Sequence, residues 1–290
     1  MDHTGNDRNG LYFIIDGRNS HNGITDRLKA AVGLYYIAKC NGVGFHFIHK
    51  AGFDIRDYLK PNNVHWSAEL SDLSIFPWKK RRLDYVLPFE GIPELSLNLQ
   101  YICTRYVGKN NIEMMNVPDW QHVWRDLFWE LFTPSDAVLE ALTQTGMPKH
   151  YIAVNARFIN SLGSFEDSAY NAPLSEKTQA ALIDAVLSKV SECIKNSDYP
   201  AVISSDSVRF LKEAEKRGFQ IIDTNGIGHI MNPDVGELVY LKTFVNFFLL
   251  AGAEKIFSIL NVEGVPENSL YKTQYPRYAA IVGNKPFVRI

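Results

Sequence analysis

Short apolar runs alternate with stretches of helical periodicity at the start of the chain. The run from Leu11 to Asp16 leads into a turn-forming Asp-Gly pair, and apolar residues then recur at helical spacing from Ile24 to Ala38. A further apolar run, with glycines at its start, covers Val43 to Ile48. Strand, helix and strand in this order form a βαβ unit of about 30 residues, so the pattern predicts a parallel sheet.

The region that follows is less regular. Residues 50–94 carry four prolines, which predicts loops and short elements there. We expect a strand at Leu99 to Tyr106 and helices at Trp120 to Leu131 and Ser135 to Leu142. A proline and a serine between these two helices form a helix-start signal, which separates them.

The C-terminal half repeats the alternation of strand and helix. The predicted strands are Tyr151–Val154, Ala201–Ser204, Phe219–Ile222 and Lys255–Ser258, and the predicted helices are Glu176–Ile194, Val208–Lys216 and Val235–Ala251. The stretch from Thr145 to Lys149, with its glycine and proline, is the best domain boundary, giving domains 1–147 and 148–290. The sequence therefore predicts two α/β domains with parallel sheets and a cleft between them.

Composition excludes several classes of protein. Thirty basic and 32 acidic residues give a net charge of -2, so no global field would draw the protein onto nucleic acid or an anionic membrane. The three cysteines show no CxxC spacing, so neither a disulfide framework nor a thiolate zinc site is indicated. The first ten residues lack the apolar core of a signal peptide, and no stretch reaches about 18 apolar residues. We expect a soluble, cytoplasmic protein without an integral membrane segment.

The loop after the first predicted strand is a candidate anion site. It combines glycines with short polar residues and two arginines, and its notable members are Asp16, His21, Gly23, Asp26 and Arg27. A helix N-terminus at this position presents unpaired N–H groups and partial positive charge to an anion. An ordinary polar loop with an N-cap explains the same composition, and the two interpretations are about equally supported.

The loop after the strand at Tyr151 contains Arg157. An arginine directly beyond a buried strand places a planar, permanently charged fork in the cleft, which suits a phosphate or a carboxylate. Alternatively, Arg157 pairs with Asp206, which follows the next strand. Asp206 or Ser207 could itself cap the helix that begins at Val208.

The segment after Ser258 is the last candidate. A loop with Gly264 and Pro266 leads to Ser269 and Arg277, and small polar residues ahead of a helix could hold a diphosphate through backbone N–H groups.

Several familiar chemistries have no motif in the sequence. It contains no GxxxxGK[ST], GxSxG, HExxH or GxGxxG pattern, which removes the best support for P-loop enzymes, α/β-hydrolases, zincins and standard dinucleotide binding. The absence of an Asp-x-Asp pair counts against a nucleotide-sugar enzyme that clamps its diphosphate with a metal ion. Arginines and helix N-termini are the expected substitute.

The remaining unusual residues have ordinary explanations. Trp78 to Arg82 form one strong basic cluster, which in a near-neutral protein is more typical of a solvated face or the rim of an acceptor site than of a nucleic-acid interface. The aromatic residues from Trp120 to Phe132 recur at helical spacing and are expected in the core. His21 and His229 lie in cleft-side loops, although a lone loop histidine is more often idle than catalytic.

Taken in order, these loops resemble those of the fucosyltransferase superfamily, which includes α1,2-, α1,6- and protein O-fucosyltransferases. The segments that carry the resemblance are the Gly-rich loop at Asn22–Leu28, the counterpart of the family's His-x-Arg motif at Val154–Arg157, the Ser-Asp strand end at Ile203–Ser207, the LLAGAEKIFS segment at Leu249–Ser258 and the ending at Ser269–Pro286. The likeness is strongest from Tyr151 onward. In this chain Asn155 stands where many relatives have His, and Phe158-Ile159 replaces the usual polar continuation.

The resemblance implies a GT-B-like fold, with two Rossmann-like domains facing across a cleft. It also implies a metal-independent inverting glycosyltransferase without a cofactor, transferring sugar from a nucleotide diphosphate, GDP-fucose favoured, to a glycan or polysaccharide acceptor. The C-terminal domain would hold the donor and the N-terminal domain the acceptor. By resemblance, Arg157 would bind the β-phosphate of the donor, and Ser269 would start the helix on the diphosphate side. The full set of donor-binding residues that the resemblance implies is Gly23, Arg27, Asn155, Arg157, Ser205, Asp206, Ser258, Ser269 and Arg277.

An inverting transfer also needs a base for the acceptor hydroxyl. Asp26 ranks first and His21 second, with Asp16 also open. A non-catalytic nucleotide-sugar or glycan-binding protein of the same fold is the main alternative, because Asn155 departs from the family pattern. An epimerase on two such domains is a third hypothesis, but the nicotinamide site that it needs has no motif in the sequence.

Overall fold

The computed structural model describes residues 9–19, 23–83, 92–105, 111–163, 173–195, 197–222 and 236–290. The chain divides into two compact units, Met1–Ser135 and Asp136–Ile290. Each unit contains a parallel sheet, which confirms the expected α/β class. The predicted domain boundary at 147/148 follows helix α3 (Asp136–Gln144), whereas the structural division precedes it.

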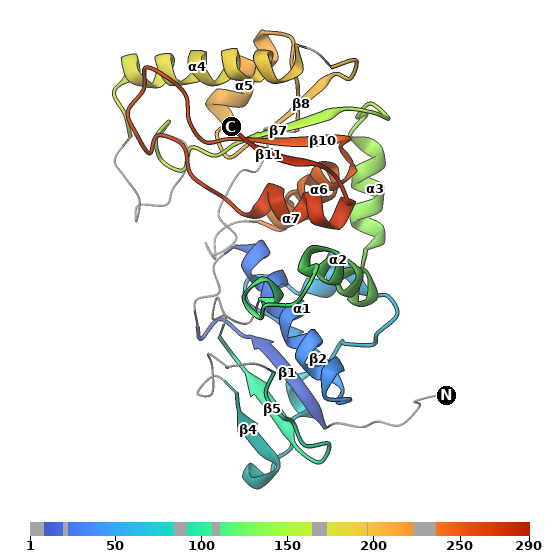
Figure 1. The fold of residues 1–290 in the computed structure, drawn as a ribbon. Coiled ribbons are helices and arrows are strands. Elements are labelled where there is room, and N and C mark those ends of the chain that lie inside the picture. The colour runs from blue at the N-terminus through green and yellow to red at the C-terminus, as the bar shows by residue number, and fades with distance from the viewer. Residues whose placement is uncertain are drawn as a thin grey trace. The chain divides into compact units, whose positions relative to one another are not determined.

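The first unit is built on a four-stranded parallel sheet in the order β2-β1-β5-β4 (Figure 1). The strands are β1 (Gly10–Ile15), β2 (Phe45–His49), β4 (Lys80–Arg82) and β5 (Gln100–Cys103). Helix α1 (Ile24–Cys40) connects β1 to β2, and the two strands are parallel neighbours, as the predicted βαβ unit requires. All six residues of β1 are buried because neighbouring strands and packed side chains surround it.

Aromatic side chains fill the rest of this unit's core. Helix α2 (Trp120–Leu131) buries Trp124 and Phe128 completely, which confirms the expected core position for these two aromatic residues, whereas Trp120 and Trp129 are only partly buried. Phe132 follows in β6 (Phe132–Pro134), which pairs antiparallel with β3 (Leu59–Pro61). Short 3-10 helices, at Ile55–Asp57, Leu70–Asp72, Pro77–Lys79 and Ile112–Met114, complete the described elements.

The second unit contains a five-stranded parallel sheet in the order β11-β10-β7-β8-β9. The strands are β7 (Ile152–Ala156), β8 (Ala201–Ser205), β9 (Gln220–Ile221), β10 (Lys255–Ile259) and β11 (Phe287–Arg289). The chain builds outward from β7 in one direction and then returns to place β10 on its other side. The strand order therefore reverses between β7 and β10, where sheets of this type bind ligands beyond the carboxyl ends of the strands.

Helices cover both faces of this sheet (Figure 1). The helices are α4 (Glu176–Ile194) and α5 (Val208–Lys216) on one face, and α6 (Glu237–Gly252) and α7 (Tyr275–Gly283) on the other. Ile152, Val154 and Ala156 pack in a core cluster with residues of α4 and α5. Because side chains alternate along a strand, Asn155 belongs to the opposite face, toward α6 and α7. Among the described residues, no helix has the length and apolarity needed to cross a membrane.

Candidate functional site

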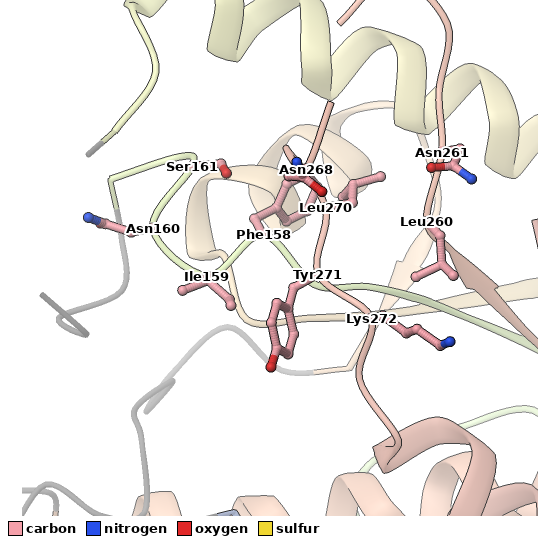
Figure 2. Close-up of a pocket in the computed structure, with 10 residues that line it drawn as sticks. All are labelled: Phe158, Ile159, Asn160, Ser161, Leu260, Asn261, Asn268, Leu270, Tyr271 and Lys272. Carbon is pink, nitrogen blue, oxygen red and sulfur yellow. The ribbon is translucent and has the colours of Figure 1, made fainter. Parts of the chain in front are cut away.

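A cavity of about 450 Å³ lies at the point where the strand order of the second unit reverses. Figure 2 shows that two chain segments line it, one following β7 and the other following β10. The lining residues are Phe158, Ile159, Asn160, Ser161, Leu260, Asn261, Asn268, Leu270, Tyr271 and Lys272. Apolar surface combined with a few amides, a hydroxyl and one ammonium is typical of a site for a small organic ligand.

Asp206 fixes the first of these segments. Its two carboxylate oxygens accept hydrogen bonds from the backbone N–H groups of Phe158 and Ile159, both at 2.8 Å. Burial raises the pKa of Asp206, and the positive charge of Arg157 and the two N–H groups act in the opposite direction. Because both oxygens already accept backbone bonds, Asp206 holds the shape of the loop after β7.

Arg157 lies between this loop and the segment after β10. Its Nε is 3.8 Å from Oδ2 of Asp206, so the pairing expected as an alternative is present as a long ion pair. Its carbonyl oxygen accepts a 2.7 Å hydrogen bond from the N–H of Tyr271, and its guanidinium carbon is 5.7 Å from the centre of the Tyr271 ring. The Arg157 side chain retains 29% exposure. Arg157 does not itself line the cavity, but it is next to two residues that do: Phe158 follows it in the chain, and the Tyr271 ring lies beside its guanidinium.

The start of α7 is held close to this arginine. Burial raises the pKa of Tyr275, the first residue of α7, and the positive charge of Arg157 opposes that rise. The Tyr275 hydroxyl donates to the carbonyl oxygen of Thr243 at 2.5 Å, which fixes the N-terminus of α7 to α6. The Tyr275 side chain thus joins α7 to α6, and its hydroxyl lies within the electrostatic influence of the Arg157 guanidinium.

Ile159 adopts a left-handed backbone conformation, with φ of 50°. This conformation is costly for a β-branched residue and is usually found where a site requires it. Asn268, on the opposite side of the cavity, also has a positive φ of 62°. The sequence gives no signal for the conformation of Ile159.

A row of polar residues crosses the sheet just before the carboxyl ends of its strands. Ser204, Asn155, Ser258 and Arg289 are neighbours in adjacent strands. Asn155 donates to Oγ of Ser204 at 3.3 Å, and its own Oδ1 is buried without a hydrogen-bond partner among the described residues. Asn155 and Ser258 are almost fully buried and do not line the cavity, so the structure places these two predicted donor residues beneath it.

The other predicted residues of this unit have local partners. The Ser205 hydroxyl accepts from the N–H of Ser207, and Ser207 caps α5, as the sequence suggested. The Ser269 hydroxyl donates to the carbonyl oxygen of Pro266 at 2.6 Å. Helix α7 begins later, at Tyr275, so the expectation that Ser269 starts this helix is wrong. Arg277 lies in the first turn of α7 and is partly buried.

Four predicted residues belong to the loop and helix start of the first unit. Asp16 forms an ion pair with Arg18, and Gly23 is the N-cap of α1. Asp26 forms an ion pair of 2.5 Å with Lys29 and keeps 26% side-chain exposure. His21 and His229 both lie outside the described residues.

Arg27, the remaining predicted residue of this unit, is only 2% exposed. Its Nη1 lies 2.7 Å from Nε2 of His49 and 3.4 Å from the carbonyl oxygen of Ala51. Nδ1 of His49 lies 3.0 Å from the carbonyl oxygen of Phe53. Because a carbonyl oxygen can only accept a hydrogen bond, the hydrogen of this imidazole is on Nδ1. Nε2 therefore accepts from Arg27, and the structure holds this arginine inside the unit.

The structure also identifies residues that the sequence did not single out. Tyr271 and Lys272 belong to the predicted segment that starts at Ser269, and Asn261 lies just after the predicted strand Lys255–Ser258. In the structure all three line the cavity. Their shared position, after the strand that neighbours β7, is the signal that could have identified them. Among the described residues, no group of three His, Cys, Asp or Glu side chains is placed to hold a metal ion.

Comparison with known proteins finds solved structures with a similar fold. Neither a protein-family model nor a curated protein sequence matches the chain. A NodZ α1,6-fucosyltransferase structure soaked with GDP-fucose is 11% identical, covers 94% of this chain and 92% of its own, and has a TM-score of 0.59. The same enzyme co-crystallised with GDP is 12% identical, with 93% and 91% coverage and a TM-score of 0.56.

A structure of fucosyltransferase NodZ from Bradyrhizobium is 14% identical, with coverage of 93% and 92% and a TM-score of 0.55. These comparisons support the fold that the sequence resemblance implied. The chain shares the α/β fold of these fucosyltransferase structures over nearly its whole length.

Proposed function

We propose that the chain is a fucosyltransferase-like glycosyltransferase that uses a nucleotide-diphosphate sugar, with GDP-fucose favoured, and a glycan or polysaccharide acceptor. The observation that carries the proposal is the cavity at the reversal of strand order, with Arg157 anchored at its edge. The similar structures that hold GDP-fucose or GDP support this choice of donor.

Arg157 is the residue that we assign to the leaving group. Sugar transfer moves negative charge onto the departing diphosphate, so a fixed positive charge there stabilises the transition state more than the ground state. Asp206 and Tyr271 restrain the backbone at the carbonyl group of this arginine and at the two residues after it, which limits its motion during the reaction. The N-terminus of α7 adds partial positive charge. This arrangement suits a reaction that does not depend on a metal ion.

We assign proton removal from the acceptor to the first unit. In an inverting reaction the base must deprotonate the acceptor hydroxyl while the diphosphate leaves on the opposite side of the sugar. Asp26 remains the first choice because its carboxylate is partly exposed, near the N-terminus of α1. Lys29 beside it forms an ion pair with this carboxylate. His21 and Asp16 are the alternatives.

The decisive experiment combines donor binding with turnover. A thermal-shift screen with GDP, UDP, ADP and their sugars identifies the donor, and a transfer assay on a glycan panel follows. We expect GDP-fucose to raise Tm, and Arg157→Ala to lower kcat/KM by about 10²- to 10³-fold, as for removal of one oxyanion-stabilising group. Arg217→Ala is the matched control, because Arg217 is exposed and pairs with Asp184 on the surface.

Three results would change this conclusion. If Arg157→Ala keeps activity within a few-fold of wild type, Arg157 does not stabilise the leaving group. Binding of GDP-fucose without turnover on any acceptor would favour the non-catalytic nucleotide-sugar-binding protein. Absence of any nucleotide-induced shift would argue against both functions.

A further inference from the structure

The segment of residues 75–82 lies at the edge of the first sheet. It contains exposed apolar side chains followed by consecutive lysines and arginines, and we call it the basic-apolar segment. Ile75, Phe76 and Trp78 are 83%, 47% and 65% exposed. Lys79 and the three basic residues of β4 follow immediately. Large apolar side chains with this exposure usually mark an interaction surface when they cluster.

The backbone brings the two kinds of side chain onto the same turn. The rings of Phe76 and Trp78 stack, with centroids 4.8 Å apart and planes inclined by 30°. Nη1 of Arg81 donates to the carbonyl oxygens of Trp78 (3.3 Å) and Lys80 (2.9 Å). The guanidinium of Arg81 is thereby held against the turn that carries Trp78, so positive charge and apolar surface are adjacent.

Protection of the sheet edge does not explain the whole segment. Strand β4 is the edge strand, and lysine or arginine on such a strand prevents pairing with other chains. The same requirement disfavours exposed apolar side chains beside the edge, yet Ile75, Phe76 and Trp78 are there. The apolar part of the segment therefore needs a partner of its own.

The apolar side chains fit a lipid layer better than a carbohydrate. Sugar rings bind on open aromatic faces, but Phe76 and Trp78 each cover one face of the other. Ile75 is the most exposed of the three and has no flat face. Aromatic and aliphatic side chains flanked by Lys and Arg are the combination that enters the interface of a bilayer.

We propose that the basic-apolar segment docks the protein onto an anionic lipid bilayer. Ile75, Phe76 and Trp78 enter the headgroup region, and the cations meet lipid phosphates. In the part of the chain that the structure describes, no ion pair involves Lys79, Lys80 or Arg81. The net charge of -2 does not oppose docking, because charges farther than about 8 Å are screened at physiological ionic strength.

Vesicle co-sedimentation tests this proposal without measuring sugar transfer. Wild-type protein is mixed with vesicles of phosphatidylcholine alone, or with about 30 mol% phosphatidylglycerol to add negative charge. We expect strong binding only to the anionic vesicles. Phe76→Ser/Trp78→Ser should abolish sedimentation with them. Lys79→Gln/Arg81→Gln should weaken binding about 25-fold, since each cation near an anionic surface contributes about fivefold.

Matched variants on the second unit separate docking from general surface effects. Leu139→Ser/Leu238→Ser removes exposed apolar side chains, and Lys195→Gln/Lys212→Gln removes exposed charges. Both should sediment like wild type, and circular dichroism should show that all variants are folded. Binding that is unchanged in the segment variants, or absent with every vesicle, overturns the proposal. Retention on dextran sulfate without vesicle binding would identify a polyanionic carbohydrate instead.

Discussion

Replacing Asp206 by asparagine tests whether this carboxylate shapes the cavity. Each oxygen of Asp206 accepts one backbone N–H, from Phe158 and from Ile159. Asparagine has one acceptor oxygen and an NH₂ group, so it can satisfy only one of the two N–H groups. The other N–H then faces a donor and loses its partner.

The expected loss of stability follows from these contacts. A buried N–H without an acceptor costs about 1–3 kcal/mol. At 3.8 Å, the attraction between Asp206 and Arg157 is about 4 kcal/mol for an effective dielectric constant near 20. Burial raises the pKa of Asp206, so the cost of burying its charge offsets much of that attraction, and asparagine avoids this cost. We therefore expect a net loss of about 1–3 kcal/mol.

Thermal unfolding and GDP calorimetry measure the two consequences. A loss of this size lowers Tm by about 3–9 °C for a unit of this length. The loop carrying Arg157 also loses an anchor, so we expect the Kd for GDP to rise about tenfold, which corresponds to about 1.4 kcal/mol. Asp184→Asn is the control, because Asp184 is an exposed surface partner of Arg217. A Tm within about 1 °C of wild type, together with an unchanged Kd, would refute the loop-fixing role of Asp206.

Two further predictions concern stability. In Gly283→Ala, the new Cβ would lie 1.9 Å from the carbonyl oxygen of Ala251, so we expect the free energy of unfolding to fall by about 1–3 kcal/mol. Gly236→Ala is the control, because a Cβ there meets open space and should change Tm little. Equal Tm values for the two variants would contradict the close packing of α6 and α7. Burial alone would raise the pKa of Asp54, but hydrogen bonds from Arg56 and Lys50 lower it to about 2. The carboxylate of Asp54 thus stabilises the fold above pH 3.8, by about 2 kcal/mol, and this contribution is lost as the pH falls through about 2. Asp54→Asn should therefore unfold more easily than wild type at pH 6 in urea titrations, and the difference should shrink steadily as the pH falls through about 2; a difference of constant size from pH 6 to below pH 2 would exclude this origin.

The longer elements follow from local sequence. The ranges expected for α2, α4 and α5 agree with the structure at both ends, because helical periodicity and clear end signals coincide there. Ser207, for example, caps α5 through its side chain. Strand β4 was not expected, since Lys80–Arg82 has no apolar alternation and is a strand only through its pairing with β5.

The candidate site is only partly visible in the sequence. Arg157 follows a strand that periodicity identifies, so its location could be predicted. The bond between its carbonyl oxygen and Tyr271 joins distant parts of the chain and depends on the strand order. Arg27 shows the opposite case: its glycine-rich surroundings favour a ligand, but tertiary contacts with His49 and Ala51 occupy its guanidinium.

The hydrogen bond from the N–H of Tyr271 to the carbonyl oxygen of Arg157 joins main-chain atoms, so it does not depend on any side chain. Substituting the lining residues Asn261 and Lys272 would alter the chemistry of the cavity while leaving that main-chain bond in place. The cavity is therefore suited to laboratory evolution, in which a library at these two positions changes the preferred donor without disturbing the backbone.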